Sequence, residues 1–426
     1  MRIGIAGLGT VGASLAGLLS DDKAKNTIFS AAQERLTLQA VSARTRGRDR
    51  GVDLSNIEWV DDPVALAGDS DIDVFVELMG GADGIAKESV ETALRSGKHV
   101  VTANKALLAK HGVALAGLAS DNGVALRFEA AVAGSIPIIA TLRESISAVK
   151  ISSLRGILNG TCNYILSQME QHGQDYHVAL KDAQQLGYAE ADPSLDVGGH
   201  DSAHKLAILC ALAFGVMPQE ADLDITGIED VGGDDIFYAG EMGHSIRLLG
   251  IASYLDGALN FSVKPCLVLK HASFASVAGA NNHIEIISDL VPTMSLTGPG
   301  AGAGPTATAV AGDVLALSNI DSKTTHDHAF GRLASGLKTH KASKGMGENY
   351  PYYVRINTRN VHDVLTGMGQ AGIGFTSPME KNTNSGVLQG VTQALSPQQY
   401  DEFETYLDKT VSKEARYALY PIINDA

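Results

Sequence analysis

The chain begins Met1-Arg-Ile-Gly-Ile-Ala-Gly-Leu-Gly-Thr-Val-Gly12, and this stretch decides the fold of its first part. Residues 2–6 form an apolar run typical of a buried strand, and Val11–Leu19 has the apolar spacing of a helix. The glycines between them have G-x-G-x-x-G spacing. A strand, a glycine turn and a helix in this order bind the pyrophosphate of a dinucleotide at the helix N-terminus. A tight turn without a ligand is the alternative.

Short apolar runs continue this pattern as far as residue 130. They predict strands at 36–43, 74–78, 99–102 and 125–128, with helices at 84–96 and 105–122. Strands that alternate with helices form parallel βαβ units. The sequence therefore predicts an α/β fold whose first domain, residues 1–130, is a Rossmann-type doubly wound parallel sheet. Residues 21–35 are predicted to form an irregular or helical insertion.

The pattern changes after residue 130. Residues 131–297 are predicted to form an α+β catalytic and dimerisation domain, with strands at 150–158, 261–269, 283–288 and 293–297, a helix opened by 134–137 and another at 162–172. Residues 298–320, a glycine-rich turn before a helix at 306–317, are predicted to return to the first domain. Residues 318–349 are polar and predicted to be a linker.

Residues 350–426 are predicted to form a small C-terminal α+β domain. Its predicted strands are 352–357, 373–377 and 386–392, and its predicted helices are 361–371 and 397–407.

Composition limits the function classes. The net charge of −15 and the 5% aromatic content argue against nucleic acid as the main partner. The three cysteines are odd in number and far apart, which is typical of reduced thiols in a cytoplasmic protein. We expect no signal peptide, and the most apolar helix, Leu206–Phe214, is too short to span a bilayer. The sequence predicts a soluble, cytoplasmic protein with no membrane partner.

The choice of cofactor is predicted from the end of the second strand. The chain reads Ser42-Ala-Arg-Thr-Arg-Gly-Arg48 there, with no carboxylate before Asp49. An NAD enzyme commonly has an acid at this point for the ribose 2′-hydroxyl. Arg44, and after it Arg46, can instead pair with a 2′-phosphate, so we predict NADP, with NAD still possible. A solvated basic loop is the alternative.

Two further segments carry candidate catalytic lysines. Lys105 follows a strand, where open α/β sheets bind ligands, and is either a surface charge or a group facing nicotinamide and substrate. Lys205 and Asp201 lie four residues apart on one helix face, just after Glu190, Asp192 and Asp196. An ordinary helical ion pair is the alternative. Several carboxylates around one ammonium suit a zwitterionic substrate and a proton-transfer step.

Two histidines in this segment superficially resemble a metal pair. His200 and His204 are four residues apart, with Asp196 nearby. No H-E-x-x-H pattern and no further ligand are evident, so we do not expect a transition-metal site.

These segments together resemble the homoserine dehydrogenase family, over about residues 1–317. The similar blocks, in the family's order, are GLGTVG from Gly7, TANKALLA from Thr102, EAAVAGSIP from Glu129, GILNGTCNYIL from Gly156, GYAEADPSLDVGGHDSAHKLAIL from Gly187 and GPGAGAGPTATAVAGDV from Gly298. Residues 350–426 resemble an ACT-like regulatory domain, although Val361-His-Asp363 stands where the family usually has a Pro-Gly turn.

The resemblance implies reversible NAD(P)-dependent interconversion of L-homoserine and L-aspartate 4-semialdehyde, a step of threonine, methionine and isoleucine biosynthesis. It implies that Lys205 is the proton donor and acceptor and that Lys105 lies close to nicotinamide and substrate. The implied substrate-binding residues are Glu190, Asp201, Asp196, Gly160 and Thr161. The cofactor-binding residues expected from the motifs and the resemblance are Gly7, Gly9, Thr10, Val11, Gly12, Arg44, Gly80, Thr102, Lys105 and Gly302.

The resemblance also implies a structural sodium ion, bound largely by backbone carbonyls. Its site would fall on Glu129, Val132, Gly134 and Ile136. We further expect a homodimer or homotetramer.

Two other functions remain open at this point. One is an enzyme of the same class acting on another small amino-acid-derived aldehyde or oxo acid. The other is a catalytically silent protein that senses NADP and an amino acid. The enzyme reading is chemically sensible because a lysine ammonium can both protonate a developing alkoxide and stabilise its charge.

Overall fold

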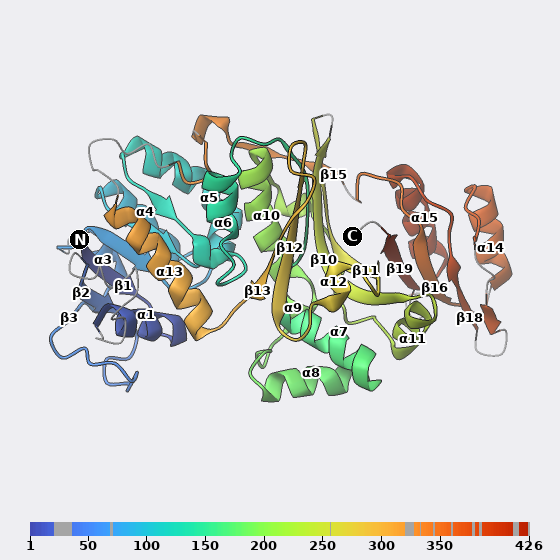
Figure 1. Cartoon of the computed structure of the whole chain (residues 1–426), viewed down its shortest axis with the longest axis horizontal. Coiled ribbons are helices and arrows are strands. Elements are labelled where there is room, and N and C mark those ends of the chain that lie inside the picture. The colour runs from blue at the N-terminus through green and yellow to red at the C-terminus, as the bar shows by residue number, and fades with distance from the viewer. Residues whose placement is uncertain are drawn as a thin grey trace. The chain divides into compact units, whose positions relative to one another are not determined.

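The computed structural model (Figure 1) describes residues 1–20, 36–68, 71–255, 257–319, 328–332, 334–343, 346–358, 361–376, 380–382, 386–411 and 417–424. The predicted insertion at 21–35 lies outside these residues. The chain folds into two compact units, each built from three segments. The first consists of Met1–Val149, Ala207–Met217 and Gly298–His340, and the second of Lys150–Leu206, Pro218–Thr297 and Lys341–Ala426.

The first unit contains a parallel six-stranded sheet. Its order is β3-β2-β1-β4-β5-β6, with β1 at its centre. The strands are β1 (Arg2–Ala6), β2 (Thr37–Ser42), β3 (Glu58–Trp59), β4 (Val74–Glu77), β5 (His99–Thr102) and β6 (Leu126–Arg127). This order reverses direction at β1, which is the doubly wound arrangement. The predicted Rossmann-type fold is confirmed.

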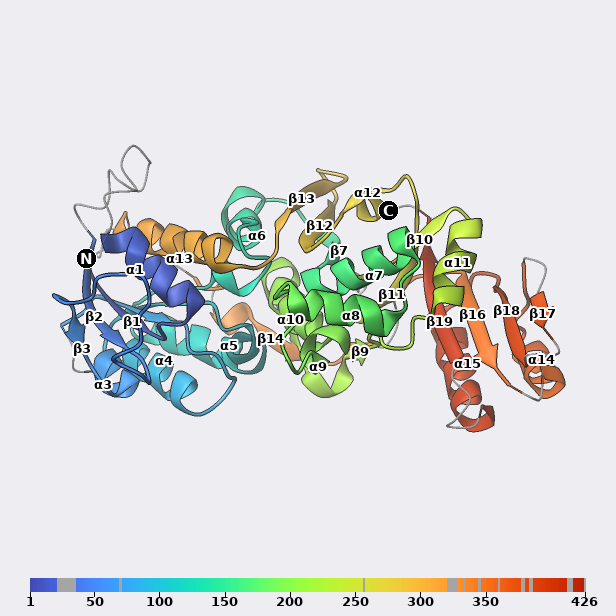
Figure 2. The same ribbon diagram turned by 90° about the horizontal axis from the view of Figure 1, so that it is seen from below.

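Helices cover both faces of this sheet (Figure 2). One face carries α1 (Thr10–Ser20) and α13 (Ala303–Ser318), which lie side by side although they are almost 300 residues apart in sequence. The other face carries α3 (Pro63–Gly68), α4 (Ile85–Arg95) and α5 (Lys105–Asp121). Because both faces are covered, the strands are continuous apolar runs such as Ile3–Ile5 and Val74–Val76, all of them buried.

After β6 the first unit continues in short helical segments. These are η2 (Glu129–Ala131), α6 (Ile138–Ala140) and η3 (Thr141–Ser145), so the predicted helix after residues 134–137 is short. The unit extends to Val149, beyond the predicted boundary at residue 130.

The second unit contains a mixed sheet of order β13-β12-β7-β10-β11-β19-β16-β18-β17. The strands of its first half are β7 (Ile151–Ile157), β10 (His244–Leu255), β11 (Ala258–Leu269), β12 (Asn281–Ser288) and β13 (Met294–Pro299). Among these, β10 pairs antiparallel with both β11 and β7. The sequence did not indicate β10, because its run HSIRLLGIASYL is buried almost throughout and shows no two-residue alternation.

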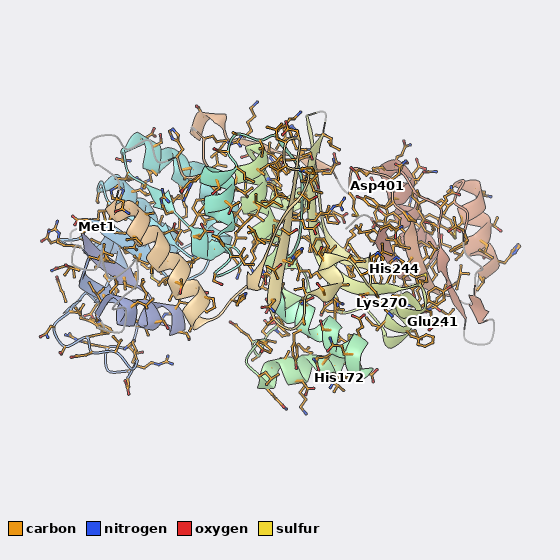
Figure 3. The ribbon with its side chains drawn as sticks, in the orientation of Figure 1. Met1, His172, Glu241, His244, Lys270 and Asp401 are labelled. Carbon is orange, nitrogen blue, oxygen red and sulfur yellow. The ribbon has the colours of Figure 1, made fainter. Side chains whose placement is uncertain are left out.

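Helices of the second unit are α7 (Gly160–His172), α8 (Tyr176–Gln185), α9 (Ser194–Val197), α10 (His200–Phe214), α11 (Gly233–Glu241) and α12 (Ser273–Ser276), with α10 continuing into residues of the first unit. The side chains of Lys270 and His244, labelled in Figure 3, bind backbone carbonyls in the connection between α11 and β10. There Lys270 donates to the Gly240 carbonyl over 3.2 Å, and a ring nitrogen of His244 lies 2.7 Å from the Met242 carbonyl.

The C-terminal part has β-α-β-β-α-β order. Its elements are β16 (Tyr352–Asn357), α14 (Val361–Gln370), β17 (Glu380–Asn382), β18 (Val387–Val391), α15 (Pro397–Thr410) and β19 (Tyr417–Ile423). Of the expected strand at 373–377, the described residues 373–376 form a bridge between Phe375 and Thr392. Ser396 accepts from the backbone N–H of Gln399 and thereby caps α15.

Three short strands pair in turn with the outer edge of β11. They are β15 (Ala342–Ser343), β9 (Asp224–Ile225) and the end of β19, and all three run parallel to β11. Segment 318–349, predicted as a linker, thus supplies β15, and it also supplies β14 (Lys338–His340), which pairs with β8 (Val216–Pro218). Its polar sequence has no apolar alternation that would have revealed these strands.

Candidate active site

Three glycines shape the turn between β1 and α1, each for a different reason. Gly7 has φ +101°, and a side chain there would run into the Leu78 carbonyl. A Cβ on Gly12 would run into the carbonyl of Gly7, so Gly12 allows α1 to pack closely on β1. A Cβ on Gly9 would meet open space. The glycine at this position therefore leaves the N-terminus of α1 open to a ligand.

A pocket of about 570 Å³ opens at this turn. It is lined by the glycine turn, the loop after β2 and the loop after β4, including Gly80, Arg44, Arg48 and one acid, Asp61. Arg46, the second candidate for the 2′-phosphate, lies over the Trp59 ring, 5.8 Å from its centre. Three arginines line the pocket: Arg44, for which we predicted pairing with the 2′-phosphate, Arg48 and Arg50.

Arg50 holds this basic loop in place, and the sequence analysis did not single it out. Its Nε donates to the Leu8 carbonyl over 3.2 Å, its Nη1 to the Arg48 carbonyl over 2.8 Å and its Nη2 to the Thr45 carbonyl over 2.5 Å. Its guanidinium also lies 5.4 Å from the centre of the Trp59 ring. One planar group therefore ties the basic loop to the glycine turn. In the sequence nothing distinguishes Arg50 from the other arginines of residues 44–50.

The loop after β5 lies at the same edge of the sheet. Thr102 is fully buried and donates its hydroxyl to Glu77 over 2.6 Å. Asn104 accepts from the Leu107 N–H over 3.1 Å and caps α5, whose first residue is Lys105. Lys105 thus lies beyond the carboxyl end of a parallel strand, where open α/β sheets bind ligands.

The remaining predicted nucleotide contacts lie at helix starts. Thr10 and Val11 are the first two residues of α1, and Gly302, with φ +122°, directly precedes α13.

In the second unit, Lys205 lies on α10 and is only 8% exposed. Its Nζ donates to Asp201 Oδ2 and to the Leu158 carbonyl, both over 2.7 Å. Asp201 is itself only 4% exposed. A buried ammonium against a buried carboxylate is unlike the solvated helical ion pairs of a protein surface, which contribute little to stability. This placement weakens the alternative of an ordinary surface pair.

Asn159 connects Asp201, the partner of Lys205, to Asp196, a second predicted substrate-binding acid. Its amide donates to Asp201 Oδ2 and to Asp196 Oδ1, both over 2.8 Å. Its carbonyl oxygen accepts from the Cys162 N–H over 2.8 Å and so caps α7. The sequence analysis missed this role, although an asparagine between a predicted strand and helix is a recognised capping signal.

The other predicted substrate residues lie at the start of α7 or on residues 187–196, an acidic loop that carries Glu190, Asp192 and Asp196. Gly160 is the first residue of α7, and a Cβ there would run into the Ala280 carbonyl. Thr161 donates to the Tyr188 carbonyl over 2.7 Å. Glu190 is exposed and lies outside the hydrogen-bonded network of Lys205, Asp201 and Asn159.

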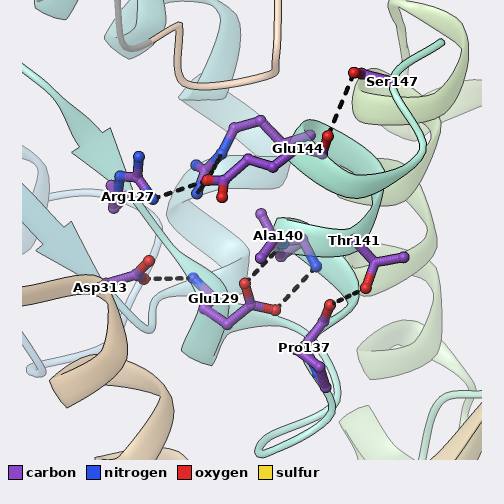
Figure 4. Close-up of polar contacts among 10 residues, drawn as sticks. Arg127, Glu129, Pro137, Ala140, Thr141, Glu144, Ser147 and Asp313 are labelled. Atoms are coloured by element: carbon purple, nitrogen blue, oxygen red, sulfur yellow. Dashed lines mark hydrogen bonds and ion pairs between the residues drawn. The ribbon is translucent and has the colours of Figure 1, made fainter. Parts of the chain in front are cut away.

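The predicted sodium-binding segment is a tight turn held by a buried carboxylate (Figure 4). Glu129 Oε1 accepts from the Ile139 N–H over 2.9 Å and Oε2 from the Ala140 N–H over 2.8 Å. Its backbone N–H donates to Asp313 over 2.7 Å. Burial, and then the charge of Asp313, raise the pKa of Glu129 to about 7.

Two successive residues of this turn have left-handed backbone conformations. Ala133 and Gly134 both have φ +56°, and Ala133 is the one such non-glycine residue in the described part of the chain. A side chain on Gly134 would collide with the backbone of Pro299 and Gly300. Such conformations turn successive carbonyls away from regular hydrogen bonding.

In the described part of the chain, no group of three or more His, Cys, Asp or Glu side chains is arranged to hold a metal ion. No helix there is long and apolar enough to cross a membrane. Cys162 is close to Asp196 but fully buried, and burial raises the pKa of its thiol well above the usual range. It is therefore a poor nucleophile.

Comparison with known proteins identifies the family. Residues 7–129 match the model of the homoserine dehydrogenase NAD-binding domain, and residues 137–315 match the homoserine dehydrogenase model. The homoserine dehydrogenase of Neisseria gonorrhoeae is 41% identical over 76% of this chain and 74% of its own length.

Solved structures agree with this result over the whole chain. A homoserine dehydrogenase from Thiobacillus denitrificans superposes with a TM-score of 0.89 at 32% identity, covering 100% of this chain and 98% of that one. A hyperthermophilic archaeal homoserine dehydrogenase in complex with NADPH has a TM-score of 0.61 at 27% identity, covering 74% of this chain and 96% of that one. The chain is an oxidoreductase that belongs to the homoserine dehydrogenase family.

Proposed function

We propose that the chain interconverts L-homoserine and L-aspartate 4-semialdehyde, with Lys205 as the residue that moves the proton. The observation that carries this proposal is the buried Lys205–Asp201 pair, extended by Asn159 to Asp196. A fold does not need a lysine in such a place, because burying two charges costs about as much as their attraction returns. A proton-transfer site does need it.

The chemistry follows from the charges of these groups. The bound nicotinamide would supply or accept the hydride at the carbonyl carbon. In the reductive direction the Lys205 ammonium donates a proton to the developing alkoxide and stabilises its negative charge. In the oxidative direction its neutral amine takes the proton from the homoserine hydroxyl. Asp201 orients the ammonium, and Lys105 in the first unit lies close to nicotinamide and substrate.

The acids of the second unit suit the other end of the substrate. The exposed carboxylate of Glu190 binds the α-ammonium, with Asp201 and Asp196 beside it and with Gly160 and Thr161 lining the same pocket. This contact fixes the substrate at one end and positions its reacting carbon.

For the cofactor we propose NADP. Arg44 and Arg48 line the pocket at the glycine turn and pair with the 2′-phosphate, while Asp61 is the one acid among the described lining residues. A guanidinium is well suited to bind a phosphate through two hydrogen bonds. Thr10, Val11, Gly80 and Gly302 complete the nucleotide contacts, and NAD remains the second choice.

The turn at Glu129 suits a sodium ion. The two left-handed residues, Ala133 and Gly134, and the closely approaching backbone at Gly300 are supporting observations. Backbone carbonyls of Glu129, Val132, Gly134 and Ile136 would hold the ion, and hard oxygen ligands suit such a cation. The ion's role here is structural.

We further propose that residues 350–426 are an ACT-like regulatory domain and that the chain works in the cytoplasm as a homodimer or homotetramer. The β-α-β-β-α-β order with strand order β19-β16-β18-β17 supports the domain assignment.

One assay tests the central proposal. Initial rates are measured with homoserine and with NADP or NAD in parallel, with and without threonine, and then with homologous amino alcohols. We expect homoserine to give the highest kcat/KM and NADP to be preferred. A higher kcat/KM for another amino alcohol would reassign the substrate, and a lack of homoserine-dependent reduction of either cofactor would refute the activity.

A further inference from the structure

We propose that Glu77 is a positioning residue of the reaction: its buried carboxylate locks together the two loops that carry Gly80 and Lys105. The inference rests on the proposed roles of Gly80 and Lys105 and adds the group that sets their geometry. The sequence analysis assigned no role to Glu77.

Glu77 lies at the carboxyl end of a strand in the parallel sheet. It is the last residue of β4, and it pairs in register with Thr102, the last residue of the neighbouring parallel strand β5. Its side chain is completely buried. Because parallel strands present their carboxyl ends at the ligand-binding edge, this buried carboxylate lies directly behind that edge.

Each oxygen of the carboxylate holds a different loop. Oε1 accepts from the backbone N–H groups of Met79 over 2.7 Å and Gly80 over 3.0 Å. Oε2 accepts from the Thr102 hydroxyl over 2.6 Å. The loop after β4, which lines the cofactor pocket, is therefore bound to the end of β5 through a single side chain.

The connection continues from Thr102 to the start of α5. The Thr102 oxygen accepts from the Asn104 N–H over 3.0 Å. The Asn104 side chain caps α5 through Leu107 and donates back to the Gly81 carbonyl over 2.7 Å. Residues 79–81 and 102–107 thus form a closed ring of hydrogen bonds with Lys105 at the start of its helix.

The chemistry of this ring requires a carboxylate. Three donors converge on Glu77, and a carboxylate accepts on both oxygens, whereas the amide of glutamine accepts on one and donates on the other. Burial of a carboxylate is costly unless it is fully hydrogen-bonded, and the core does not need one at this position. The carboxylate therefore serves to hold the two loops rigidly.

The main test is Glu77→Gln in the full chain. We expect kcat, expressed per NADP-binding site, to fall about tenfold or more, because one donor loses its acceptor in a buried site. The KM for homoserine should change less than threefold, since Glu77 lies outside the acidic loop proposed to bind the substrate. A kcat within twofold of wild type overturns the inference.

Thr102 variants test the same hydrogen-bonded ring independently, in case Glu77→Gln fails to fold. Thr102→Val removes only the hydroxyl and should lower kcat severalfold, while Thr102→Ser should recover most of that loss. The double variant Glu77→Gln/Thr102→Val should be no slower than Glu77→Gln alone, because both changes break the same ring. Full additivity, or a Thr102→Val variant within twofold of wild type, overturns the inference.

Ser89 is the matched control in the same unit. It is completely buried on α4 and donates its hydroxyl to the Ile85 carbonyl over 2.7 Å, so Ser89→Ala removes a comparable hydrogen bond away from the ring. We expect its kcat to match wild type.

Lys105→Ala distinguishes a failure of the proposed role of Lys105 from a failure of the inference about Glu77. A wild-type rate for Lys105→Ala refutes both. A slow Lys105→Ala with a normal Glu77→Gln refutes the inference alone.

Discussion

The glycine turn of the first unit and the Lys205 cluster of the second differ in what they are made of. At the turn, backbone N–H groups and missing side chains shape a pocket of about 570 Å³ around Gly7 and Gly9. At the cluster, four side chains (Lys205, Asp201, Asn159 and Asp196) are joined by hydrogen bonds of 2.7–2.8 Å.

This difference teaches how each site tolerates change. A backbone site depends on steric space, so it loses function when atoms are added. A side-chain network depends on particular charges and donors, so it loses function when atoms are removed. Four variants test what individual side chains contribute to sites of these two kinds, in order of decreasing effect.

The largest effect is expected at Lys205, where the network has its one ammonium. Lys205→Ala should lower kcat by about 10²- to 10⁴-fold, the usual contribution of a positioned acid or base. Binding of NADP, measured by fluorescence titration, should stay close to wild type, because the cofactor pocket lies in the first unit.

Lys270→Ala is the matched control, since Lys270 is an exposed lysine of the same unit. It should retain wild-type kcat. A Lys205→Ala variant with near-normal turnover would remove the proposed proton-transfer role.

Glu129 combines the two kinds of site, because a side chain there binds backbone N–H groups. Its pKa is raised from 4.5 to about 7, so the folded protein holds a proton that the unfolded chain has already released. The free energy of unfolding should therefore fall as pH rises from about 4.5 to 7, by on the order of 3 kcal/mol from this group.

Denaturant unfolding at several pH values, in buffer without sodium, measures this change. Glu129→Gln removes the titrating group, so the free energy of unfolding of wild type minus that of the variant should fall as pH rises across this window. A difference that is constant between pH 4.5 and 7 would show that the carboxyl ionises normally in the folded protein.

Arg44 is the side chain that we expect to distinguish NADP from NAD at the backbone site. Arg44→Ala should lower kcat/KM for NADPH about tenfold, the value of roughly one exposed charge-assisted hydrogen bond, and leave that for NADH nearly unchanged. Arg95→Ala, an exposed arginine on α4, is the control. Equal losses with both coenzymes would mean that Arg44 does not read the 2′-phosphate.

The smallest effect is expected at Asn159, which connects the network to a helix start. Asn159→Ala should cost about 1 kcal/mol of stability through the lost cap of α7, and it should lower kcat only severalfold because Asp201 still holds Lys205. Circular-dichroism unfolding and steady-state rates measure the two effects. A loss of kcat as large as that of Lys205→Ala would make Asn159 part of the proton-transfer step itself.

The fold of the first unit could be predicted from sequence because its signals are local. A glycine turn and buried strands alternating with helices carry their periodicity in a few residues, as at Gly7–Gly12. The second unit was harder to predict. Its long strand β10 is buried on both faces and lacks alternation. The strand β15 pairs with β11, and β19 pairs with β16 and β11, all of which are distant in sequence.

The residues of the candidate site also differ in how far sequence could predict them. Residue types at fixed spacing, such as Asp201 and Lys205, could be selected from sequence. Glu77 and Arg50 could not, because their partners are backbone groups and the Thr102 hydroxyl, up to 42 residues away, whose positions only the fold determines. Sequence therefore revealed the groups that can react more readily than those that hold them.

The three short strands along β11 have a practical consequence for truncation. A chain shortened to its first 340 residues would lose β15 and β19 and expose N–H and C=O groups near both ends of β11, whose middle still pairs with β9. Such an exposed edge can pair with strands of other molecules, so the shortened protein should self-associate. Deleting this C-terminal region would thus cost solubility unless the newly exposed border is redesigned.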